Sequence, residues 1–539
     1  MKKLKLNFQT IQADQLSGLS KFDLHYIYQP EALEPIIGAS SYQQQITRAL
    51  KERQSFQGRQ EIMDLLLAQY KDTHNCQLTL DNIRKLIQPN CFTVICAHQP
   101  CIFGGPLYWI YKILSTIAYC RQLKKEYPDN EFIPIYFSGN EDHDFDEINH
   151  LYIFNKKIQW NEIPGKAVGR LTTHNLTQVI HELMEVFKAN TFAQQFLEEE
   201  LHIVQNSSNY ASYFRHFTTK LFSNYGLIYF DPDDPLAKEK LIPILLQELS
   251  EQFIYSSTKQ SSELLLQQGF QLQVNPRELN LFYHHSSGRK RIVKLSAHHF
   301  SLVDNTKTWT LDEIQLEVKL HPENFSPNVM LRPIYQEILF PNVAFIGGGA
   351  EINYWMQLYS SFAAIHVSFP ALIRRHSLWY IDQAMSQKIQ KSGILKLDFF
   401  KSKNELEAQL LATHENISPV PAKAFQDIED VLLKIKQLIS SLDASTQSSI
   451  AAEIQKMIKS KEHIEQKIRK YQKSKFDTEL QVIYKIKDQL FPEGIPQERH
   501  FNFLAYYFQF GELYFDVLLE RLEMHATEML IAEEQEAQD

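Results

Sequence analysis

The sequence predicts an α/β protein with a parallel-sheet core, inserted connecting subdomains and an α-helical antiparallel coiled-coil domain. Two observations support this prediction. Short apolar strands alternate with helical segments in the first two thirds of the chain, and apolar residues step by three and four in the last third. The first pattern is typical of parallel sheets and the second of paired helices. We expect the core at residues 1–375, the coiled-coil domain at 376–500 and a C-terminal helix at 501–539 that returns toward the core.

The clearest strand–helix–strand unit lies near the start of this core. The β-branched run FTVIC (92–96) precedes the loop AHQPCIFGG (97–105), a segment with helical apolar spacing, and the strand-like run FIPIYF (132–137). Pro106 stands where proline suits the first turn of a helix. This order predicts two parallel strands joined by a crossover helix.

The same pattern recurs further along the chain. Three segments predict further strands, the first ending in an acidic turn and the second leading through glycines into a helix: 226–235, 343–365 and 370–375. The stretches between them predict two inserted subdomains, at about 151–220 and 236–325. The second includes a hairpin that turns at Ser287–Gly288. These elements extend the parallel sheet and give a doubly wound core.

The C-terminal third has a different pattern. Two runs of apolar residues step by three and four on either side of the polar break DASTQSS (443–449): Ile428, Leu432, Ile435, Ile439 and Leu442, then Ile450, Ile454, Met457, Ile464, Ile468 and Tyr471. Lys461 occupies one position of this seam. The two runs predict the arms of an antiparallel helical hairpin.

Composition excludes several classes of protein. The chain has 539 residues, 44% hydrophobic and 22% charged, with a formal net charge of -9. An acidic chain lacks the positive surface that wraps nucleic acid, so we expect no nucleic-acid partner. We find no signal-peptide pattern and no apolar run long enough to span a membrane, so we expect a cytoplasmic protein without membrane contact. The five cysteines form no CxxC pair, so zinc is not expected.

Three loops follow predicted strands and bear polar groups, and ligands bind at such strand ends in open parallel sheets. The first is AHQPCIFGGP. Its adjacent glycines, Gly104 and Gly105, precede a helix and could offer backbone N–H groups to an anion. His98 and Gln99 lie directly after the strand. Alternatively, the glycines only shape the turn.

The second loop is SGNEDHDFDEINH (138–150). Five carboxylates and two histidines crowd together there beside Asn140: Glu141, Asp142, Asp144, Asp146, Glu147, His143 and His150. Crowded carboxylates raise one another's pKa unless a cation neutralises them. A divalent metal, a substrate ammonium group or general-base duty would explain the cluster. If residues 143–150 are helical, His143, Asp146 or Glu147, and His150 share one face. The alternative is a solvated acidic loop.

The third loop is FIGGGAEINY, where Gly347 and Gly348 lead into a helix with Glu351 in its first turn. Upstream, Asn328 and Arg332 lie one helical turn apart. Arg332 could fork onto a carboxylate or phosphate, or pair with Glu337 or another acid as a structural bridge. Two weaker signals are FDPDDP (230–235), a Mg²⁺ site or helix cap, and GRKR (288–291), a phosphate contact or exposed hairpin tip.

Five colinear blocks resemble the bacillithiol biosynthesis cysteine-adding enzyme family: HQPCIFGGPLYWIYK, GNEDHDFDEINH, DPDDP, SPNVMLRPIYQEILFPNVAFIGGGAEINYWMQL and FPEGIPQER. The resemblance implies a Rossmann-type core with connecting segments and a coiled coil used for homodimerisation. It also implies a cysteine ligase that joins L-cysteine to glucosaminyl-malate in the last step of bacillithiol biosynthesis.

The resemblance gives the loops expected roles. Activating a carboxylate for amide formation implies ATP and Mg²⁺ as cofactors. His98 or Gln99, with the Gly104 and Gly105 amides, would then stabilise phosphate charge. Asp142, His143 or Asp146 would hold the sugar amine, take its proton or bind Mg²⁺. Arg332 and Asn328 would bind a carboxylate.

Competing functions remain open at this point. The acidic loop (141–150) would also suit a metal-dependent hydrolase or a transferase that does not use ATP. A non-catalytic scaffold would use the coiled coil and leave the core passive. A class I aminoacyl-tRNA synthetase is less favoured, because PALIRRHSLWY (370–380) provides no lysine-rich loop after the last core strand.

Overall fold

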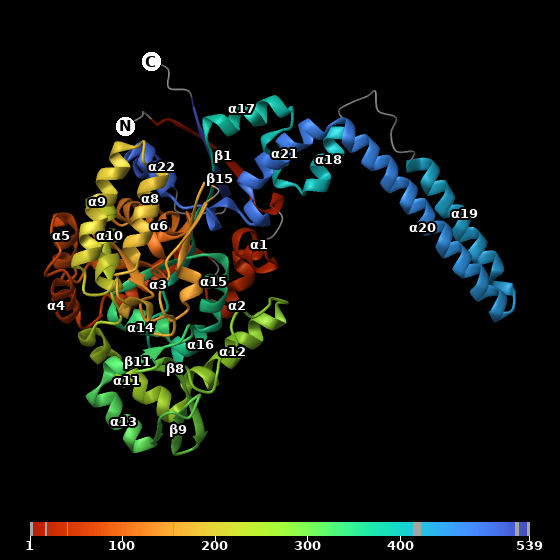
Figure 1. Ribbon diagram of the computed structural model, residues 1–539. Coiled ribbons are helices and arrows are strands. Elements are labelled where there is room, and N and C mark those ends of the chain that lie inside the picture. Colours follow the sequence, from red (N-terminus) through yellow and green to blue (C-terminus); the bar gives the residue numbers. More distant parts are fainter. Residues whose placement is uncertain are drawn as a thin grey trace. The chain divides into compact units, whose positions relative to one another are not determined.

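The computed structural model describes residues 4–16, 19–39, 41–154, 156–412, 422–522 and 528–535. The chain forms two compact units. Unit 1 comprises residues 1–380 and 496–539, and unit 2 comprises residues 381–495. Figure 1 labels the helices and strands of both units.

Unit 1 is built on a five-stranded sheet in the order β13-β12-β2-β3-β6, in which every neighbouring pair is parallel. The strands are β2 (Cys91–His98), β3 (Glu131–Ser138), β6 (Ile228–Phe230), β12 (Asn342–Gly347) and β13 (Ala371–Arg374). All but two of their residues are buried, as expected for a parallel sheet covered on both faces. The predicted parallel-sheet core is therefore confirmed.

Helix α6 (Tyr108–Glu126) connects β2 to β3 and packs against both strands. Its apolar residues and several polar ones are buried, among them Lys112, Ser115 and Thr116. Helix α3 (Tyr42–Arg53) packs against β12 and β13. These helices enclose the core, and β2 at the centre of the sheet leads directly into the loop that precedes α6.

Two long excursions interrupt the sheet. The first, between β3 and β6, contains the short helix α7 (Phe145–Ile148), the hairpin β4 (His150–Ile153) and β5 (Lys156–Gln159), and helices α8 (Leu176–Val186), α9 (Thr191–Asn206) and α10 (Tyr210–Phe222). It covers the first predicted insertion, about 151–220. Because the helix covers only residues 145–148 and His150 already begins β4, the predicted shared face of His143, Asp146 or Glu147, and His150 does not form.

The second excursion, between β6 and β12, covers the other predicted insertion. It contains α11 (Pro235–Glu251), α12 (Phe253–Gln267), α13 (Leu311–Leu320) and a sheet in the order β10-β9-β8-β7-β11. The strands of this sheet include β9 (His299–Leu302), β10 (Thr308–Thr310) and β11 (Phe325–Pro327). Within this sheet, β7 (Leu281–His285) and β8 (Gly288–Ser296) form the predicted hairpin, with His285 opposite Gly288. Asp234 caps α11 through the Leu236 N–H, so helix capping is the role this side chain takes in the FDPDDP turn.

The C-terminal residues also belong to unit 1. They form helices α22 (Leu504–Phe510) and α23 (Leu513–Leu519) and the strand β15 (Glu528–Glu534), which pairs antiparallel with β1 (Leu6–Gln12). We expected a helix alone in residues 501–539. The segment is a strand because it pairs residue by residue with β1 from Glu528 to Glu534, with Met529, Ile531 and Ala532 buried.

Unit 2 is helical: α17 (Gln383–Ser392), α18 (Lys403–Ala412), α19 (Ala422–Leu438), α20 (Ala444–Lys475) and α21 (Asp477–Leu490). Helices α19 and α20 lie along each other as a hairpin (Figure 1), and the predicted coiled-coil domain is confirmed. Leu432 and Ile454 are buried there, and Lys461 forms an ion pair with Glu429. In the described part of the chain, no helix is long and apolar enough to cross a membrane.

Candidate functional site

A cavity of about 970 Å³ opens in unit 1 where β2, β3 and β12 end. His98 is the last residue of β2, Ser138 is the last of β3, and Gly348 directly follows β12; all three line the cavity. The volume lies at the upper end of the ~300–1,000 Å³ typical of small-molecule sites. The three predicted loops, distant in sequence, therefore meet in one cavity.

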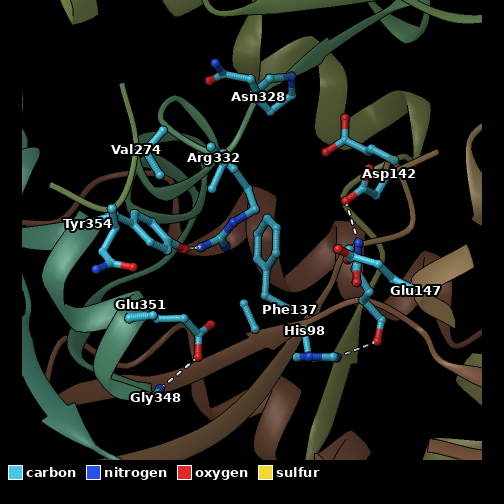
Figure 2. A pocket seen from close by; sticks show the side chains of 18 of the residues that line it. His98, Phe137, Asp142, Glu147, Val274, Asn328, Arg332, Gly348, Glu351 and Tyr354 are labelled. Atoms are coloured by element: carbon cyan, nitrogen blue, oxygen red, sulfur yellow. Dashed lines mark hydrogen bonds between the residues drawn. The ribbon is translucent and has the colours of Figure 1, made fainter. Parts of the chain in front are cut away.

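Charged groups of both signs line this cavity. Figure 2 shows Arg332 and Tyr354 on one side of Phe137 and Asp142 and Glu147 on the other. The cationic lining residues are Lys112, Arg277, Arg289, Arg332, Arg375 and Arg499, and the acidic ones are Glu141, Asp142, Glu147 and Glu351. We call the side with Glu141, Asp142 and Glu147 the acidic wall and the side with Lys112 and Arg332 the cationic wall.

Asp142 is the most heavily bonded residue of the acidic wall. Its carboxylate accepts hydrogen bonds from Gln99 Nε2 (2.7 Å) and from the His143 N–H (2.7 Å). Arg289 Nη1 lies 3.6 Å from Asp142 Oδ1 and also donates to His143 Nδ1 (3.2 Å). Burial alone would raise the pKa of Asp142, but these bonds and the Arg289 charge outweigh it and lower the pKa. Asp142 is therefore a stable carboxylate.

Glu141 is neutralised from inside the protein. Its carboxylate accepts a hydrogen bond from Lys238, which also donates to the Phe325 carbonyl (2.7 Å) and lies 3.5 Å from Asp233. Burial raises the pKa of Glu141, and the Lys238 charge opposes that rise. The repulsion expected in this acidic loop is thus relieved by the protein's own Lys238 and Arg289, and no bound guest is needed for it.

Glu141, Asp233 and His284 together form a possible donor set for a metal ion. Ligand atoms of Glu141, Asp233 and His284 lie within 4.8 Å of one another, and within the described residues they are the only such group. However, the Lys238 ammonium lies among them, bonded to Glu141, and Arg170 forks onto Asp233 at 2.6 and 2.8 Å. These cations already supply the positive charge that a divalent ion would bring. The donor set therefore does not fit Mg²⁺.

His98 is held by two hydrogen bonds. Its Nδ1 lies 2.9 Å from the Gln99 carbonyl, which makes Nδ1 the donor, and its Nε2 therefore accepts from the Tyr108 hydroxyl at 2.9 Å. Burial and the nearby Lys112 charge lower the pKa of His98 to about 4. The imidazole is consequently neutral at pH 7, and both of its nitrogens are engaged.

Lys112 and Glu351 form a buried pair in the cationic wall. Lys112 donates to Glu351 (2.7 Å) and to the Ala97 carbonyl (2.9 Å). Glu351, in the first turn of α15 (Gly349–Gln357), also accepts from the Gly348 N–H at 2.8 Å, as Figure 2 shows. Burial raises the pKa of Glu351, but Lys112 and the Gly348 N–H outweigh it and lower the pKa. The pair is electrically balanced.

Arg332 begins α14 (Arg332–Leu339) and points into the cavity (Figure 2). Its guanidinium donates to Gln336 Oε1 (3.1 Å) and to the Tyr354 hydroxyl (3.2 Å) and lies 5.7 Å from the Phe137 ring centre. It makes no ion pair with any described residue. Glu337 pairs instead with Arg53 at 2.7 Å. The alternative reading of Arg332 as a bridge to Glu337 is therefore wrong.

Four predicted binding residues do not face the cavity. Gly104 and Gly105 are buried, and their N–H groups donate to the Cys101 and Ile102 carbonyls. A Cβ on Gly104 would meet Trp109 and one on Gly105 would meet Cys101, so both glycines serve the tight turn. Gly347 is buried, and Asn140 bonds Ser138 and Tyr229 within the fold. The predicted anion cradle at Gly104–Gly105 is therefore wrong.

Other predicted residues have mixed placements. Asp146 is exposed, lies outside the cavity and accepts only a long bond from Asn149 (3.4 Å). Asn328 lines the cavity, but its side chain caps the following turn through the Met330 and Leu331 N–H groups. Glu147 lines the cavity, and burial raises its pKa. His143 lines the cavity beside Arg289.

The predicted site residues leave out five cationic residues of the cavity: Lys112, Arg277, Arg289, Arg375 and Arg499. Arg289 belongs to GRKR, but it is buried and does not lie at an exposed hairpin tip; its guanidinium stacks 4.0 Å from the Phe282 ring centre. Arg375 is held by Glu498 at 2.7 and 3.1 Å and lies over Tyr108. In the sequence, the runs GRKR, LIRR and PQER contain Arg289, Arg375 and Arg499 and could have indicated them.

Comparisons with known proteins agree with this architecture. The family model for the N-terminal Rossmann-like domain of bacillithiol biosynthesis BshC matches residues 5–376, and that for the C-terminal coiled-coil domain matches residues 378–534. The chain is 35% identical over 469 residues to a Flavobacterium johnsoniae protein named "Putative cysteine ligase BshC", covering 86% of this chain and 87% of the relative.

Two further relatives have the same name. One, from Cytophaga hutchinsonii, is 33% identical over 90% of this chain and 92% of its own length. Another, from Bacillus mycoides, is 25% identical over 97% of both chains. The match thus extends over both units of the structure. The chain belongs to the bacillithiol biosynthesis BshC family.

Proposed function

We propose that the protein is a ligase that joins the carboxyl group of L-cysteine to the amine of glucosaminyl-malate, in the last step of bacillithiol biosynthesis. The proposal rests on the family and on one structural observation. A single cavity at the strand ends contains a firmly ionised Asp142 and, across Phe137, an Arg332 without a carboxylate partner among the described residues. Such a cavity suits a substrate that has both an amine and carboxylates.

The chemistry requires activation of the cysteine carboxylate. A free carboxylate is a poor electrophile, and forming the amide removes one of its oxygens. Transfer of a phosphoryl or adenylyl group from ATP would place that oxygen on phosphorus, so that phosphate or AMP leaves with it. The attacking amine loses a proton, which a carboxylate in the cavity accepts. ATP, with Mg²⁺ as its counter-ion, is therefore part of the proposal as a co-substrate.

On the acidic wall, we assign the substrate amine to Asp142 and Glu147. Asp142, held ionised by Gln99 and Arg289, would anchor the ammonium form. Glu147 is the better proton acceptor, because burial raises its pKa. His98, neutral and bonded at both nitrogens, would orient Tyr108 and not act as the acid or base. Asp146, outside the cavity, has no role in this scheme.

On the cationic wall, we assign anionic groups to side chains. The Gly348 N–H is already bonded to Glu351, and the Gly104 and Gly105 N–H groups are bonded within their turn. Phosphate or carboxylate oxygens would therefore meet Arg332, whose planar guanidinium can donate two parallel hydrogen bonds. Positive charge aimed at a transferring phosphoryl group also stabilises its transition state.

Product formation tests the ligase directly. Purified protein is incubated with cysteine and glucosaminyl-malate, with and without ATP and Mg²⁺, and the products are identified by mass spectrometry. We expect bacillithiol only when ATP is present, with stoichiometric release of phosphate or AMP. Bacillithiol formed equally without ATP would refute carboxylate activation, and no bacillithiol under any condition with folded protein would refute the ligase.

We also propose that the coiled coil of unit 2 mediates a homodimer. Several apolar side chains of α19 and α20 are 44% or more exposed in the single chain, among them Ile428, Leu433, Met457, Ile464 and Tyr471. Exposed apolar side chains concentrated on one hairpin indicate an interaction surface. Analytical ultracentrifugation of the wild type and of a Leu433→Glu/Met457→Glu variant tests this: the variant should sediment as a monomer, and unchanged sedimentation would contradict the proposal.

A further inference from the structure

Arg499 lies on a segment that returns to unit 1 after the helical unit. The segment begins with the 3₁₀ turn Gln497–Arg499 and runs to Asn502. Arg499 is exposed and lines the cavity. With the described residues its guanidinium makes neither an ion pair nor a hydrogen bond. It is therefore a cation available to a ligand.

The residues on both sides of Arg499 are firmly anchored. Both carboxylate oxygens of Glu498 accept hydrogen bonds from Arg375, and one also accepts from the Leu378 N–H at 3.2 Å. Asn502 Nδ2 donates to the Phe103 carbonyl (2.9 Å) and to the Gly105 carbonyl (2.6 Å). Glu498 and Asn502 are 3% and 0% exposed. The backbone at Arg499 is thus fixed from both ends.

This arrangement leaves the charge of Arg499 uncompensated. Glu498 is only 2.7 Å from Arg375, so the two form a neutral buried pair. Arg375 and Arg499 both line the cavity, but the charge of Arg375 is balanced by Glu498, whereas Arg499 has no ion pair with a described residue. An arginine on a pre-organised backbone loses less conformational freedom when it binds, which favours a binding role.

We propose that Arg499 is an oxyanion-binding residue of the cavity and that Glu498 and Asn502 are positioning residues that present it. The ligand group is a phosphate or a carboxylate, both of which a guanidinium binds through two parallel hydrogen bonds. This inference deepens the proposed function and rests on it only for the identity of the substrates.

Direct binding tests the role of Arg499 without turnover. Full-length wild type, Arg499→Gln and Arg499→Lys are titrated calorimetrically with ADP, inorganic pyrophosphate and L-malate. Arg84→Gln is the matched control, because Arg84 is an exposed arginine of α5 (Gln77–Lys85) paired only with Asp81 at the surface. We expect Arg499→Gln to weaken at least one probe by about tenfold or more, the loss of a charge-assisted bond, with Arg499→Lys intermediate and the control unchanged.

The probes also identify the ligand group. A loss confined to ADP and pyrophosphate assigns Arg499 to a phosphate, and a loss confined to malate assigns it to a carboxylate. Equal affinities of wild type and Arg499→Gln for all three probes would overturn the proposal, as would a wild type that binds none of them at millimolar concentration. A protein that binds through Arg499 but forms no bacillithiol would refute the ligase and leave this inference standing.

The positioning role needs a separate readout. Asn502→Asp removes the donor to the Phe103 and Gly105 carbonyls, so we expect it to weaken the same probe that Arg499→Gln weakens. If Asn502 acts through Arg499, the double variant binds no more weakly than Arg499→Gln alone. Additive losses in the double variant would mean that Asn502 supports the fold independently of Arg499, and the positioning role would be wrong.

Discussion

The acidic and cationic walls of the cavity differ in how many of their charges are paired within the protein. On the acidic wall, Glu141 and Asp142 are each matched by a cation from another element, Lys238 and Arg289. On the cationic wall, Lys112 is matched by Glu351, but Arg332 has no acidic partner among the described residues. Glu141 and Asp142 are thus paired before a substrate arrives, whereas Arg332 is left for the substrate.

This difference indicates where substrate charge is recognised. A buried carboxylate without a partner costs several kcal/mol, so the fold supplies Lys238 and Arg289 to avoid that cost. An arginine that lies near an aromatic ring and donates to a neutral hydroxyl costs less free energy to leave unpaired, because a guanidinium is only weakly hydrated. The cavity is therefore more strongly prepared for anionic groups than the acidic sequence 138–150 suggested.

The largest effect is expected when the acidic wall loses its internal cation. Lys238→Met leaves Glu141 buried without a counter-charge, and the free energy of unfolding should fall by ~3–5 kcal/mol. Burial already raises the pKa of Glu141, and removing Lys238 raises it further. A carboxyl group with a raised folded pKa is penalised as pH rises, so the loss should be greater at pH 8 than at pH 5. Urea denaturation at both pH values measures it.

A compensating substitution provides the control. Glu141→Gln in the Lys238→Met background removes the unpaired charge, so most of the lost stability should return and its pH dependence should vanish. If Lys238→Met alone unfolds at the wild-type urea concentration at pH 8, the acidic wall is not balanced by Lys238 and the comparison of the two walls fails.

The next largest effect is expected on the cationic wall, and on activity alone. Arg332→Gln removes a guanidinium that the fold does not use for an ion pair. The kcat/KM for ligation should fall by about 100-fold, the ~3 kcal/mol of hydrogen bonds to a charged group, with stability changed by less than about 0.5 kcal/mol. Arg332→Lys should recover only part of the activity. It restores the positive charge, but an ammonium group cannot donate two parallel hydrogen bonds to an oxyanion. Activity within threefold of wild type in Arg332→Gln would contradict the assignment.

A smaller effect with a distinct pH signature is expected at Arg289. Its charge helps to hold the pKa of Asp142 low, so activity that needs ionised Asp142 is present above that pKa and lost as pH falls through it. Arg289→Gln should raise the pKa of Asp142, move the acid limb of the kcat/KM profile to higher pH and lower kcat/KM at pH 7.5 by about tenfold. Asp142→Asn, which cannot titrate, should lack that limb. Superimposable profiles of wild type and Arg289→Gln would contradict the role of Arg289.

The sheet and the position of the site were predictable because both follow from local pattern. Strands 92–96 and 132–137 are apolar and β-branched, and polar loops begin where they end. In a parallel sheet these ends share one edge, which is why His98 and Asp142 line the same cavity. The hairpin at Ser287–Gly288 followed from turn chemistry in the same way.

The partners within the site were not predictable, because they come from distant parts of the chain. Arg289 reaches His143 over 146 residues, and Glu498 reaches Arg375 over 123. The Gly104 N–H looked available to an anion, yet it is bonded to Cys101 and covered by Trp109. Only tertiary packing decides which donors are already used, so the residue types were recognised but their roles were not.

The smallest effect is expected at the exposed rim of the cavity. Arg277 lines it but is exposed, unlike the half-buried Arg332, and Glu278 beside it is also exposed. An exposed charge acts across water and is screened by salt, so Arg277→Gln should change kcat/KM by less than about threefold at 0.15 M salt. The effect should grow at 0.01 M salt, where the Debye length is ~30 Å and charges act over longer distances. It should appear in KM. The deficit of Arg332→Gln should persist at both salt concentrations, because short, partly buried hydrogen bonds are poorly screened. Equal salt dependence of the two variants would mean that Arg332 acts only at long range, and the distinction between a bound and a steering arginine would be lost.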